Sequence, residues 1–464
     1  MDLDLIVIGS GPSGQKAAVQ AAKLGKRVAV VERRQRVGGN SIHTGTIPSK
    51  TLREAVLEGI KNRPLDIADP TNPEVRERSA VEFLMDRTAR VIGAETRVVR
   101  EQLRRNDVGL LFGDASFADE HTIRIRDGQN ERTYSAEHIV IAVGTLPARP
   151  KDVQFDDRTV IDSDGILKLE GRVPRTMTVV GAGVIGVEYA SMFGALGTKV
   201  TLVDARERIL QFLDKEIGEA LQFFMRRSNV TFRFSEEVVG VELKPEGGAI
   251  THLASGKHIP SETVLYATGR QGATADLALD AIGITPDKRG RIPVDAQFRT
   301  DVPHVFAVGD VAGPAGLAAT AMEEGRIATL HAFGQPVHER ADLLPAGVYS
   351  IPEVAFVGRT EEQLTEGAVP YVAGMSRWSE LARGLMTGDE DGMLKLLVST
   401  EDKRLLGVHA IGHAATELVH IGQAVMGCDG TVDFLVEAVF NYPTFAESYK
   451  VAALDALNRI RLMA

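Results

Sequence analysis

One succession of structural elements occurs twice in this chain. Each copy reads as an apolar strand, a turn with three glycines, an alanine-rich helix and a second apolar strand that ends in a carboxylate. The turn glycines are Gly9, Gly11 and Gly14 in the first copy and Gly181, Gly183 and Gly186 in the second. Such a repeat is typical of mononucleotide-binding units with right-handed strand–helix–strand crossovers. We therefore expect an α/β fold that contains two such units.

The spacing of the glycines indicates what these units bind. A Gly-x-Gly-x-x-Gly turn lets the backbone approach a pyrophosphate and aims the unpaired N–H groups of a helix N-terminus at the phosphates. One such turn alone is weak evidence, but both copies also have the preceding strand, the following helix and the later acidic residue. Two dinucleotides are the expected ligands.

The acidic residue of each copy bears on which dinucleotide binds. Glu32 is placed to accept hydrogen bonds from the adenosine ribose hydroxyls of the first ligand. Asp204 has the equivalent place in the second copy, where its charge favours NAD over NADP because a 2′-phosphate would meet it. Arg206 and Arg208 follow directly. Either they pair with a 2′-phosphate and allow use of both nucleotides, or they are surface arginines.

Composition excludes several other classes of protein. The formal charge of −10 argues against binding nucleic acid, and no apolar run approaches the roughly 20 residues of a membrane helix. The histidines are scattered, so no metal site is expected. The single cysteine, Cys428, excludes an internal disulfide, and we expect it to be a small buried side chain. With an apolar strand so close to Met1, we expect a cytoplasmic protein.

The remaining stretches divide by their periodicity. Residues 73–104 have helical apolar spacing and predict one long helix or a pair, and residues 105–146 turn strand-like. Residues 147–150 predict a connector, and alternation over 230–259 predicts a small β-meander. From about residue 346 strands and then helices follow, which favours a separate α+β domain.

Five segments together resemble the flavoprotein disulfide reductase superfamily across essentially the whole chain. They are the two glycine turns, Ala-Val-Gly144-Thr145, Ala-Thr268-Gly269-Arg270 and Val-Phe-Ala-Val-Gly309-Asp310. The resemblance implies two Rossmann-like dinucleotide-binding domains, for FAD and NAD(P), and a C-terminal α+β dimerisation domain. The FAD-binding domain would comprise residues 1–147 and 271–343, the NAD(P)-binding domain 148–270, and the dimerisation domain 344–464.

The resemblance also assigns residues to the cofactors. Asp310 would contact the flavin ribityl chain, and the helix near 317–321 would direct its N–H groups at the flavin, where negative charge would be stabilised. Val184 would gate the nicotinamide pocket. The further residues expected at FAD are Gly39, Thr44, Thr46, Lys50, Gly144 and Ala318, and Gly269 is expected at the nucleotide.

The segment between Gly38 and Lys50 departs from the superfamily. Disulfide reductases carry two cysteines there, and this chain has Ser41 and Thr46. Neither hydroxyl undergoes the reversible two-electron oxidation of a dithiol, so the usual disulfide relay is excluded. The C-terminal His-Pro-Thr-x-x-Glu motif of these enzymes likewise has Tyr442 in place of the histidine that serves the thiols, while Glu447 is kept. We expect Tyr442 and Glu447 to serve packing or a dimer interface.

A narrower resemblance suggests the changed reaction. Gly45-Thr46-Ile-Pro-Ser-Lys50 and Phe440-Asn441-Tyr442-Pro443-Thr444 look like the soluble, Si-specific pyridine nucleotide transhydrogenases, which pass a hydride between NADPH and NAD⁺ by way of FAD. Those proteins often keep the first cysteine, where this chain has Ser41. The resemblance implies a ping-pong hydride transfer, with Lys50 and Glu188 as an ion pair near flavin N5.

Other interpretations stay open at this stage. A diaphorase or quinone reductase that uses NAD(P)H fits the same residues, and a non-catalytic nucleotide-binding regulator is a third class. A mercuric reductase is disfavoured because the chain has no C-terminal cysteine pair. By resemblance we expect a homodimer or a larger homo-oligomer.

Overall fold

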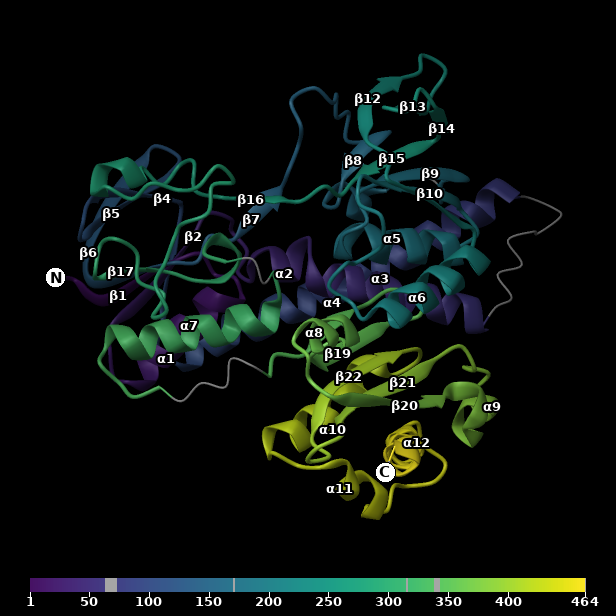
Figure 1. Cartoon of the computed structure of the whole chain (residues 1–464). Helices are drawn as coiled ribbons and strands as arrows, with labels where there is room; N and C mark the ends of the chain where they lie inside the picture. Colours follow the sequence, from purple (N-terminus) through teal and green to yellow (C-terminus); the bar gives the residue numbers. More distant parts are fainter. Residues whose placement is uncertain (63–72, 170–171, 314–315, 338–342, 464) are drawn as a thin grey trace.

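Three β-sheets organise the chain. The computed structural model describes residues 1–62, 73–169, 172–313, 316–337 and 343–463. Figure 1 shows the first sheet at the left, the second at the upper right and the C-terminal sheet at the bottom, with helices between them. The predicted class, two Rossmann-like α/β units and a C-terminal α+β unit, is confirmed.

The first sheet has the strand order β3-β2-β1-β6-β5-β4, and β17 also pairs with β6. Its parallel part is nearly all apolar because helices α1 and α7 pack beside it. The strands are β1 (Leu3–Ile8), β2 (Val28–Glu32), β3 (Gly109–Phe112), β4 (Asp114–Asp119), β5 (Thr122–Asp127), β6 (Asn130–Ile141) and β17 (Val305–Ala307). The helices are α1 (Pro12–Lys23) and α7 (Ala318–Ala332). We call this the first unit.

Helix α1 begins directly after Gly11 of the glycine turn. Pro12 is its first residue, where a missing N–H costs nothing and the fixed φ suits a helix. Between the first sheet and the second lie α2 (Gly39–His43), α3 (Thr46–Asn62) and α4 (Pro73–Arg105). The predicted helix or pair at 73–104 is one helix of 33 residues.

The second sheet is parallel throughout, in the order β11-β10-β9-β15-β8. Its strands are β8 (Val160–Asp162), β9 (Thr176–Val180), β10 (Lys199–Asp204), β11 (Val230–Phe234) and β15 (Thr263–Tyr266), with helices α5 (Val184–Ala195) and α6 (Lys215–Arg227). We call this the second unit. Its repeat of the β1–α1–β2 arrangement, as β9–α5–β10, confirms the internal repeat.

The predicted meander over 230–259 is wrong at its first strand. β11 joins the parallel sheet beside β10, and only β12 (Val238–Leu243), β13 (Ala249–Leu253) and β14 (His258–Ser261) form an antiparallel meander. β11 alternates because it is an edge strand, with exposed Thr231 and Arg233 between better-covered neighbours. Periodicity alone does not separate such a strand from one in an antiparallel hairpin.

Two short strands join the first and second units. β7 (Thr145–Pro147) leads out of the first unit and β16 (Arg270–Gly272) returns to it, and the two pair antiparallel. Figure 1 shows this ribbon between the two sheets. Pro147 therefore lies in a strand, and the predicted connector begins one residue later.

The C-terminal unit runs from β18 (Ala346–Val348) to α12 (Glu447–Met463). Its antiparallel sheet also contains β19 (Val354–Gly358), β20 (Tyr371–Arg377), β21 (Met393–Ser399) and β22 (Leu405–Ile411), in the order β18-β19-β22-β21-β20. Its other helices are α8 (Glu361–Glu366), α9 (Ala382–Thr387), α10 (Ala415–Gly427) and α11 (Val432–Glu437). Short 3-10 helices complete the chain at Gly165–Lys168, Leu279–Ile282, Gly309–Val311 and Trp378–Glu380.

Both faces of the C-terminal sheet are covered, by different partners. Ala355 and Val357 of β19 belong to a core with α10 and α12, whereas Val354 and Phe356 pack into the core of the second unit. Alternate side chains of one strand thus serve the two cores. The second unit is therefore fixed to the C-terminal unit as well as to the first.

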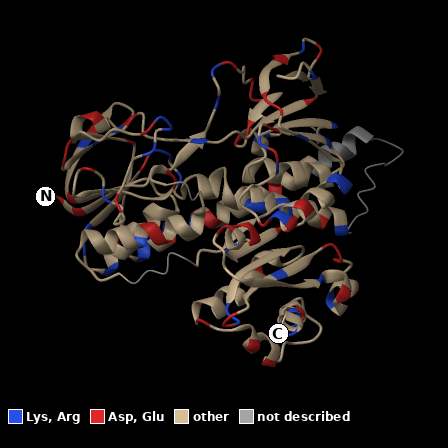
Figure 2. Cartoon of the chain, viewed as in Figure 1, with Lys and Arg blue, Asp and Glu red and all other residues tan. Residues whose placement is uncertain are grey.

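The exposure of Cys428 and the distribution of charged residues characterise the surface. Cys428 is exposed, which corrects the expected burial, because it follows directly after the last residue of α10, where the chain turns at the surface. Figure 2 shows basic and acidic residues interspersed over all three units in this view. Among the described residues, we find no helix with the length and apolar character needed to span a bilayer.

Candidate functional site

A cavity of about 540 Å³ lies where the three units meet. Its wall combines the glycine turn of the first unit, helices α2 and α3, the start of α5 and the segment after β18. The predicted residues that line it are Gly9, Gly11, Glu32, Gly39, Thr44, Thr46, Lys50, Gly144, Val184, Glu188, Asp310 and Ala318. The structure thus brings twelve residues, far apart in sequence, to one cavity.

The three glycines of the first turn have different surroundings. Gly9 has a φ of +106°, which only glycine adopts readily, and a Cβ on Gly14 would lie 2.0 Å from the Gly9 carbonyl oxygen. A Cβ on Gly11 would meet nothing within 4 Å. The first and third glycines are therefore needed for the turn and for helix packing, while the middle one leaves room for a ligand to approach.

The second turn repeats this arrangement. Gly181 has a φ of +105°, a Cβ on Gly186 would lie 1.9 Å from the Gly181 oxygen, and Gly183 again faces open space. These glycines, with Asp204, Arg206 and Gly269, lie outside the lining of the cavity. From the second unit, Ser163 and four residues of α5 line the cavity: Val184, Ile185, Glu188 and Tyr189.

Helix N-termini at the cavity lack side-chain caps. Gly11 and Leu317, the cap residues of α1 and α7, make no side-chain capping hydrogen bond, and neither does Gly183, the cap residue of α5. The first N–H groups of a helix have no partner within it, so an anionic ligand would satisfy them. Ala318 and Ala319, at the start of α7, line the cavity. The donor set fits the phosphates and the electron-rich ring edge of a flavin dinucleotide.

The acid that ends each inner strand is held by the neighbouring turn. Glu32 is buried, and it accepts hydrogen bonds from the backbone N–H of Ser10 at 3.2 Å and from its hydroxyl at 2.5 Å. In the second unit Asp204 accepts from the N–H of Ala182 at 2.5 Å. Burial alone would raise the pKa of Asp204, but hydrogen bonds from Arg206 and Ala182 hold this pKa below its ordinary value.

The two arginines that sequence could not separate have different partners. Arg206 pairs with Asp204 through two hydrogen bonds, of 2.8 Å from Nε and 2.6 Å from Nη2. Arg208 instead reaches the C-terminal unit, where its Nη1 lies 3.1 Å from Oε1 of Glu362. They do not form one cluster.

The expected pair of Lys50 and Glu188 is formed across two helices. Lys50 of α3 donates to both carboxylate oxygens of Glu188 in α5, at 2.8 and 2.7 Å. Glu188 is 3% exposed, so this ion pair is largely desolvated on the carboxylate side. Both residues line the cavity between the first and second units.

Tyr349 contacts both members of this pair, and the sequence analysis did not predict it as a site residue. Its backbone N–H donates to Oε1 of Glu188 at 2.9 Å, and the Lys50 ammonium lies 5.0 Å from the centre of its ring. Burial raises the pKa of the Tyr349 phenol. No motif marks this residue, because its role depends on the C-terminal unit lying against α3 and α5.

A hydrogen-bonded chain leads to Asp310. The Thr145 hydroxyl donates to Asp310 at 3.3 Å and accepts from Nε of Arg270 at 2.8 Å, and Asn40 donates to the Thr145 carbonyl oxygen at 2.5 Å. Beside it, Gly309 donates its N–H to Glu324 at 2.7 Å, and burial raises the pKa of that carboxyl. Asp310, in the 3-10 helix Gly309–Val311, is therefore hydrogen-bonded by Thr145 of β7, which Arg270 of β16 holds in turn.

The residues at the place of the cysteines line the cavity without any thiol. Ser41 lies in α2 and Thr46 begins α3, while the only cysteine of the chain is on the surface of the C-terminal unit. The hydroxyl group of Thr44 is buried beside the carboxyl group of Asp164.

Outside the cavity, and among the residues that the structure describes, one cluster of three acidic residues has the spacing of a metal site. It consists of Asp214, Glu216 and Glu361, whose ligand atoms lie within 4.8 Å of one another. The ammonium of Lys395 contacts all three, at 2.9, 3.0 and 2.5 Å. The Lys395 ammonium thus occupies the position that a metal ion would take between these carboxylates. We call these four residues the junction cluster, because it joins the second unit to the C-terminal unit.

The partner motif near the C-terminus lies away from these groups. Tyr442 is 72% exposed on the C-terminal unit, and Oε2 of Glu447 is buried without a hydrogen-bond partner among the described residues. Neither lines the cavity of this single chain. Their predicted role in packing or a dimer interface stays a prediction.

Comparison with known proteins gives consistent matches over the chain. Residues 3–325 match the family described as pyridine nucleotide-disulphide oxidoreductase, and residues 344–453 match its dimerisation domain. A protein of Mycobacterium tuberculosis (strain ATCC 25177 / H37Ra) named soluble pyridine nucleotide transhydrogenase is 56% identical over 466 residues, covering 100% of this chain and 98% of that protein. A protein of the same name from Hahella chejuensis (strain KCTC 2396) is 45% identical, covering 98% of each.

Solved structures agree on the fold. The copper(II) complex of the HOCl-induced flavoprotein disulfide reductase RclA from Escherichia coli has a TM-score of 0.88 at 26% identity, covering 98% of this chain and 99% of that one. LpdA from Mycobacterium tuberculosis has a TM-score of 0.88 at 24% identity, covering 99% and 100%.

Proposed function

Because the chain belongs to the pyridine nucleotide-disulphide oxidoreductase family, we propose that it is an enzyme that transfers a hydride between NADPH and NAD⁺ by way of FAD, without a redox-active disulfide. The family implies a flavin and a pyridine nucleotide as ligands. That the flavin is FAD, and that both NAD and NADP are used, belongs to this proposal. The relatives named soluble pyridine nucleotide transhydrogenase, at 56% and 45% identity, support it.

One observation carries the proposal beyond the family. The cavity that both nucleotide units share has Ser41 and Thr46 where a dithiol would stand, while the glycine turns and the Lys50–Glu188 pair are kept. Electrons therefore have no thiol relay through which to leave. Hydride transfer between two nucleotides at one flavin needs no thiol, and the glycine turns and the Lys50–Glu188 pair are still present for it.

The first unit would hold FAD. Gly9, Gly11 and Gly14 form the turn for its pyrophosphate, Glu32 would receive its ribose, and Asp310 with the start of α7 would receive its flavin half. Bound there, FAD supplies the chemistry of accepting a hydride from one nucleotide and returning it to another. Lys50 would place a positive charge where negative charge develops, and Glu188 fixes its direction.

The second unit would hold the nicotinamide nucleotide. Gly183 leaves space for the pyrophosphate, and Asp204 with Arg206 stands at the adenosine end. Val184 and Glu188 are four positions apart on α5, so they lie on one face of that helix and both line the cavity. A nucleotide on this turn would therefore direct its nicotinamide past Val184 toward Lys50.

We propose the domain division and the assembly on the same basis. Residues 1–147 with 271–343 would bind FAD, 148–270 NAD(P), and 344–464 would form the contact of a homodimer. The match of 344–453 to a dimerisation domain supports this, as do exposed apolar side chains there. These include Met386, Val439 and Leu462, which are 67%, 94% and 88% exposed.

The experiment that tests the function is anaerobic reduction of thio-NAD⁺ by NADPH with the FAD-loaded protein. We expect rapid reduction, because one site serves both nucleotides in turn, and no turnover of oxidised lipoamide, because no dithiol exists. Quinone acceptors serve as the comparison. Fast quinone turnover without nucleotide-to-nucleotide transfer would refute the transhydrogenase and favour a quinone reductase.

Tyr349 gives a second prediction within this site. Tyr349→Leu removes the ring beside Lys50, and we expect flavin reduction by NADPH to slow about three- to tenfold, the range of a partly desolvated cation–π contact. Tyr349→Phe keeps the ring and should remain within about twofold of wild type. Stopped-flow absorbance measures both rates. Tyr371→Leu, in the same unit but away from the cavity, is the matched control, and equal slowing in it would contradict the role of Tyr349.

A further inference from the structure

The loop between β10 and α6 carries both arginines that could read a 2′-phosphate. It starts after Asp204, at the end of β10, and finishes at Asp214, the cap residue of α6. At its start Arg206 lies along Asp204 in a doubly hydrogen-bonded pair. This guanidinium is 43% exposed, so it stands beside the adenosine end of the second unit and within reach of a ligand from solvent.

Arg208 is committed elsewhere. Its Nη1 lies 3.1 Å from Glu362 of α8, and its Nη2 donates to the carbonyl oxygen of Gln211 at 3.1 Å. The second carboxylate oxygen of Glu362, Oε2, is buried and has no hydrogen-bond partner among the described residues. If Arg208 left to bind a phosphate, Glu362 would lose the ion pair that compensates its partial burial. Recruitment of Arg208 by a nucleotide is therefore disfavoured.

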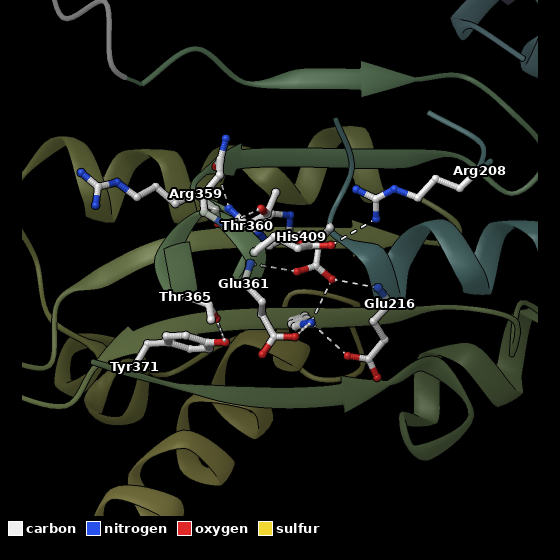
Figure 3. A network of polar contacts seen from close by, with 12 residues as sticks. Arg208, Glu216, Arg359, Thr360, Glu361, Thr365, Tyr371 and His409 are labelled. Atoms are coloured by element: carbon white, nitrogen blue, oxygen red, sulfur yellow. Dashed lines mark hydrogen bonds and ion pairs between the residues drawn. The ribbon is translucent and has the colours of Figure 1, made fainter. Parts of the chain in front are cut away.

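The far end of the loop is fixed to the same helix. Asp214 is 1% exposed, accepts from the N–H of Glu361 at 3.2 Å and from Lys395 at 2.9 Å, and also caps α6. Figure 3 shows Glu216 of the second unit and Glu361 of the C-terminal unit facing one another, with Arg208 beside them. The loop is thus anchored to α8 at two points, whereas Arg206, at its start, pairs with Asp204 of β10.

We propose that Arg206 alone reads the 2′-phosphate, and that Glu362 of the C-terminal unit is a positioning residue that holds Arg208 and, through it, the loop that presents Arg206. This inference rests on the proposed use of NADPH. It separates two arginines that the sequence presents as a pair. It also gives the C-terminal unit a part in nucleotide recognition, in addition to its contact between subunits.

Adenosine fragments test this without turnover. The FAD-loaded protein is titrated with 2′,5′-ADP, which has the 2′-phosphate, and with 5′-AMP, which lacks it, and calorimetry gives both dissociation constants. We expect Arg206→Ala to weaken 2′,5′-ADP about tenfold or more, because a charge-assisted hydrogen bond is lost, and to leave 5′-AMP within about twofold. Arg208→Ala and Glu362→Gln should weaken 2′,5′-ADP by a smaller factor and spare 5′-AMP, because both act through Arg206. In the Arg206→Ala background neither change should weaken 2′,5′-ADP further.

Two controls keep the outcomes distinct. Glu366→Gln removes the same charge from an exposed position of the same helix, and it should leave both constants unchanged. Thermal unfolding of each variant confirms that it is folded. A further loss of 2′,5′-ADP when Arg208→Ala is added to Arg206→Ala, or unchanged binding of 2′,5′-ADP in Glu362→Gln, would overturn the inference while leaving NADPH use intact. Failure of the wild-type protein to bind 2′,5′-ADP would instead contradict the proposed function.

Discussion

Gly11→Val is expected to give a folded protein without flavin, whereas Gly183→Val is expected to keep its flavin and lose reduction by NADPH. Both glycines have negative φ values, −65° and −78°, and a Cβ on either meets nothing within 4 Å. The backbone therefore accepts valine at each position. The added side chain instead occupies the space through which a pyrophosphate would approach its helix N-terminus.

The expected effects are large and separate the two units. FAD content, from absorbance and protein concentration, should fall to below about a tenth of wild type in Gly11→Val, and the NADPH reduction rate should fall at least about a hundredfold in Gly183→Val, since each 1.4 kcal/mol lost is a factor of about ten. Gly240→Val makes the same change at another open position, in β12, and should affect neither. Loss of flavin from Gly183→Val would contradict the assignment of the turns.

Lys395→Met is expected to destabilise the protein by about 3–5 kcal/mol, the cost of removing one partner from a buried ion pair. Lys395 is fully buried and holds three carboxylates together across the two units. Its strand alternates so that Leu394 and Leu396 enter the core with α12 while Lys395 faces the second unit. Methionine fills the space but leaves Asp214, Glu216 and Glu361 without a cation.

The loss should depend on pH in a defined direction. Burial alone would raise the pKa of Asp214, but the neighbouring His409 and then the hydrogen bond from Lys395 hold that pKa below its ordinary value. The wild-type junction cluster therefore stabilises above the unfolded pKa of aspartate and loses this contribution as the pH falls. Without Lys395 the carboxylates repel one another and their pKa values rise, so protonation relieves the variant.

Chemical denaturation at a series of pH values measures this. The difference in unfolding free energy between wild type and Lys395→Met should be largest near neutral pH and shrink toward about pH 4, where the carboxylates of the variant take up protons. Burial lowers the pKa of His409, which lies opposite Lys395 on β22. Lys215→Met, on exposed α6, is the matched control. A difference that grows as the pH falls would disprove the account.

Local pattern was enough to predict most of the architecture. The two glycine turns predicted the α/β units, because each turn also has the preceding strand, the following helix and the later acid. Prediction from local pattern failed where the burial of a residue depends on which other elements pack beside it. The edge strand β11 alternates like a hairpin strand, and Cys428 is exposed only because α10 ends just before it.

The site residues that belong to motifs could be predicted from the sequence. The contacts that join one unit to another could not. Lys50 and Glu188 were expected as a pair from resemblance, and they lie 2.7 Å apart. Tyr349 and Glu362 carry no local signature, since one acts through its backbone N–H and ring and the other is an ordinary helix-surface acid until Arg208 reaches it. Such contacts depend on how whole units pack, which periodicity along the chain does not contain.

The antiparallel ribbon of β7 and β16 has an evolutionary consequence. The chain leaves the first unit at Pro147 and returns at Arg270, and these two residues are directly paired. A segment whose two ends lie side by side is inserted into its host at a single point, so it can be gained, lost or exchanged by recombination without rerouting the rest of the polypeptide.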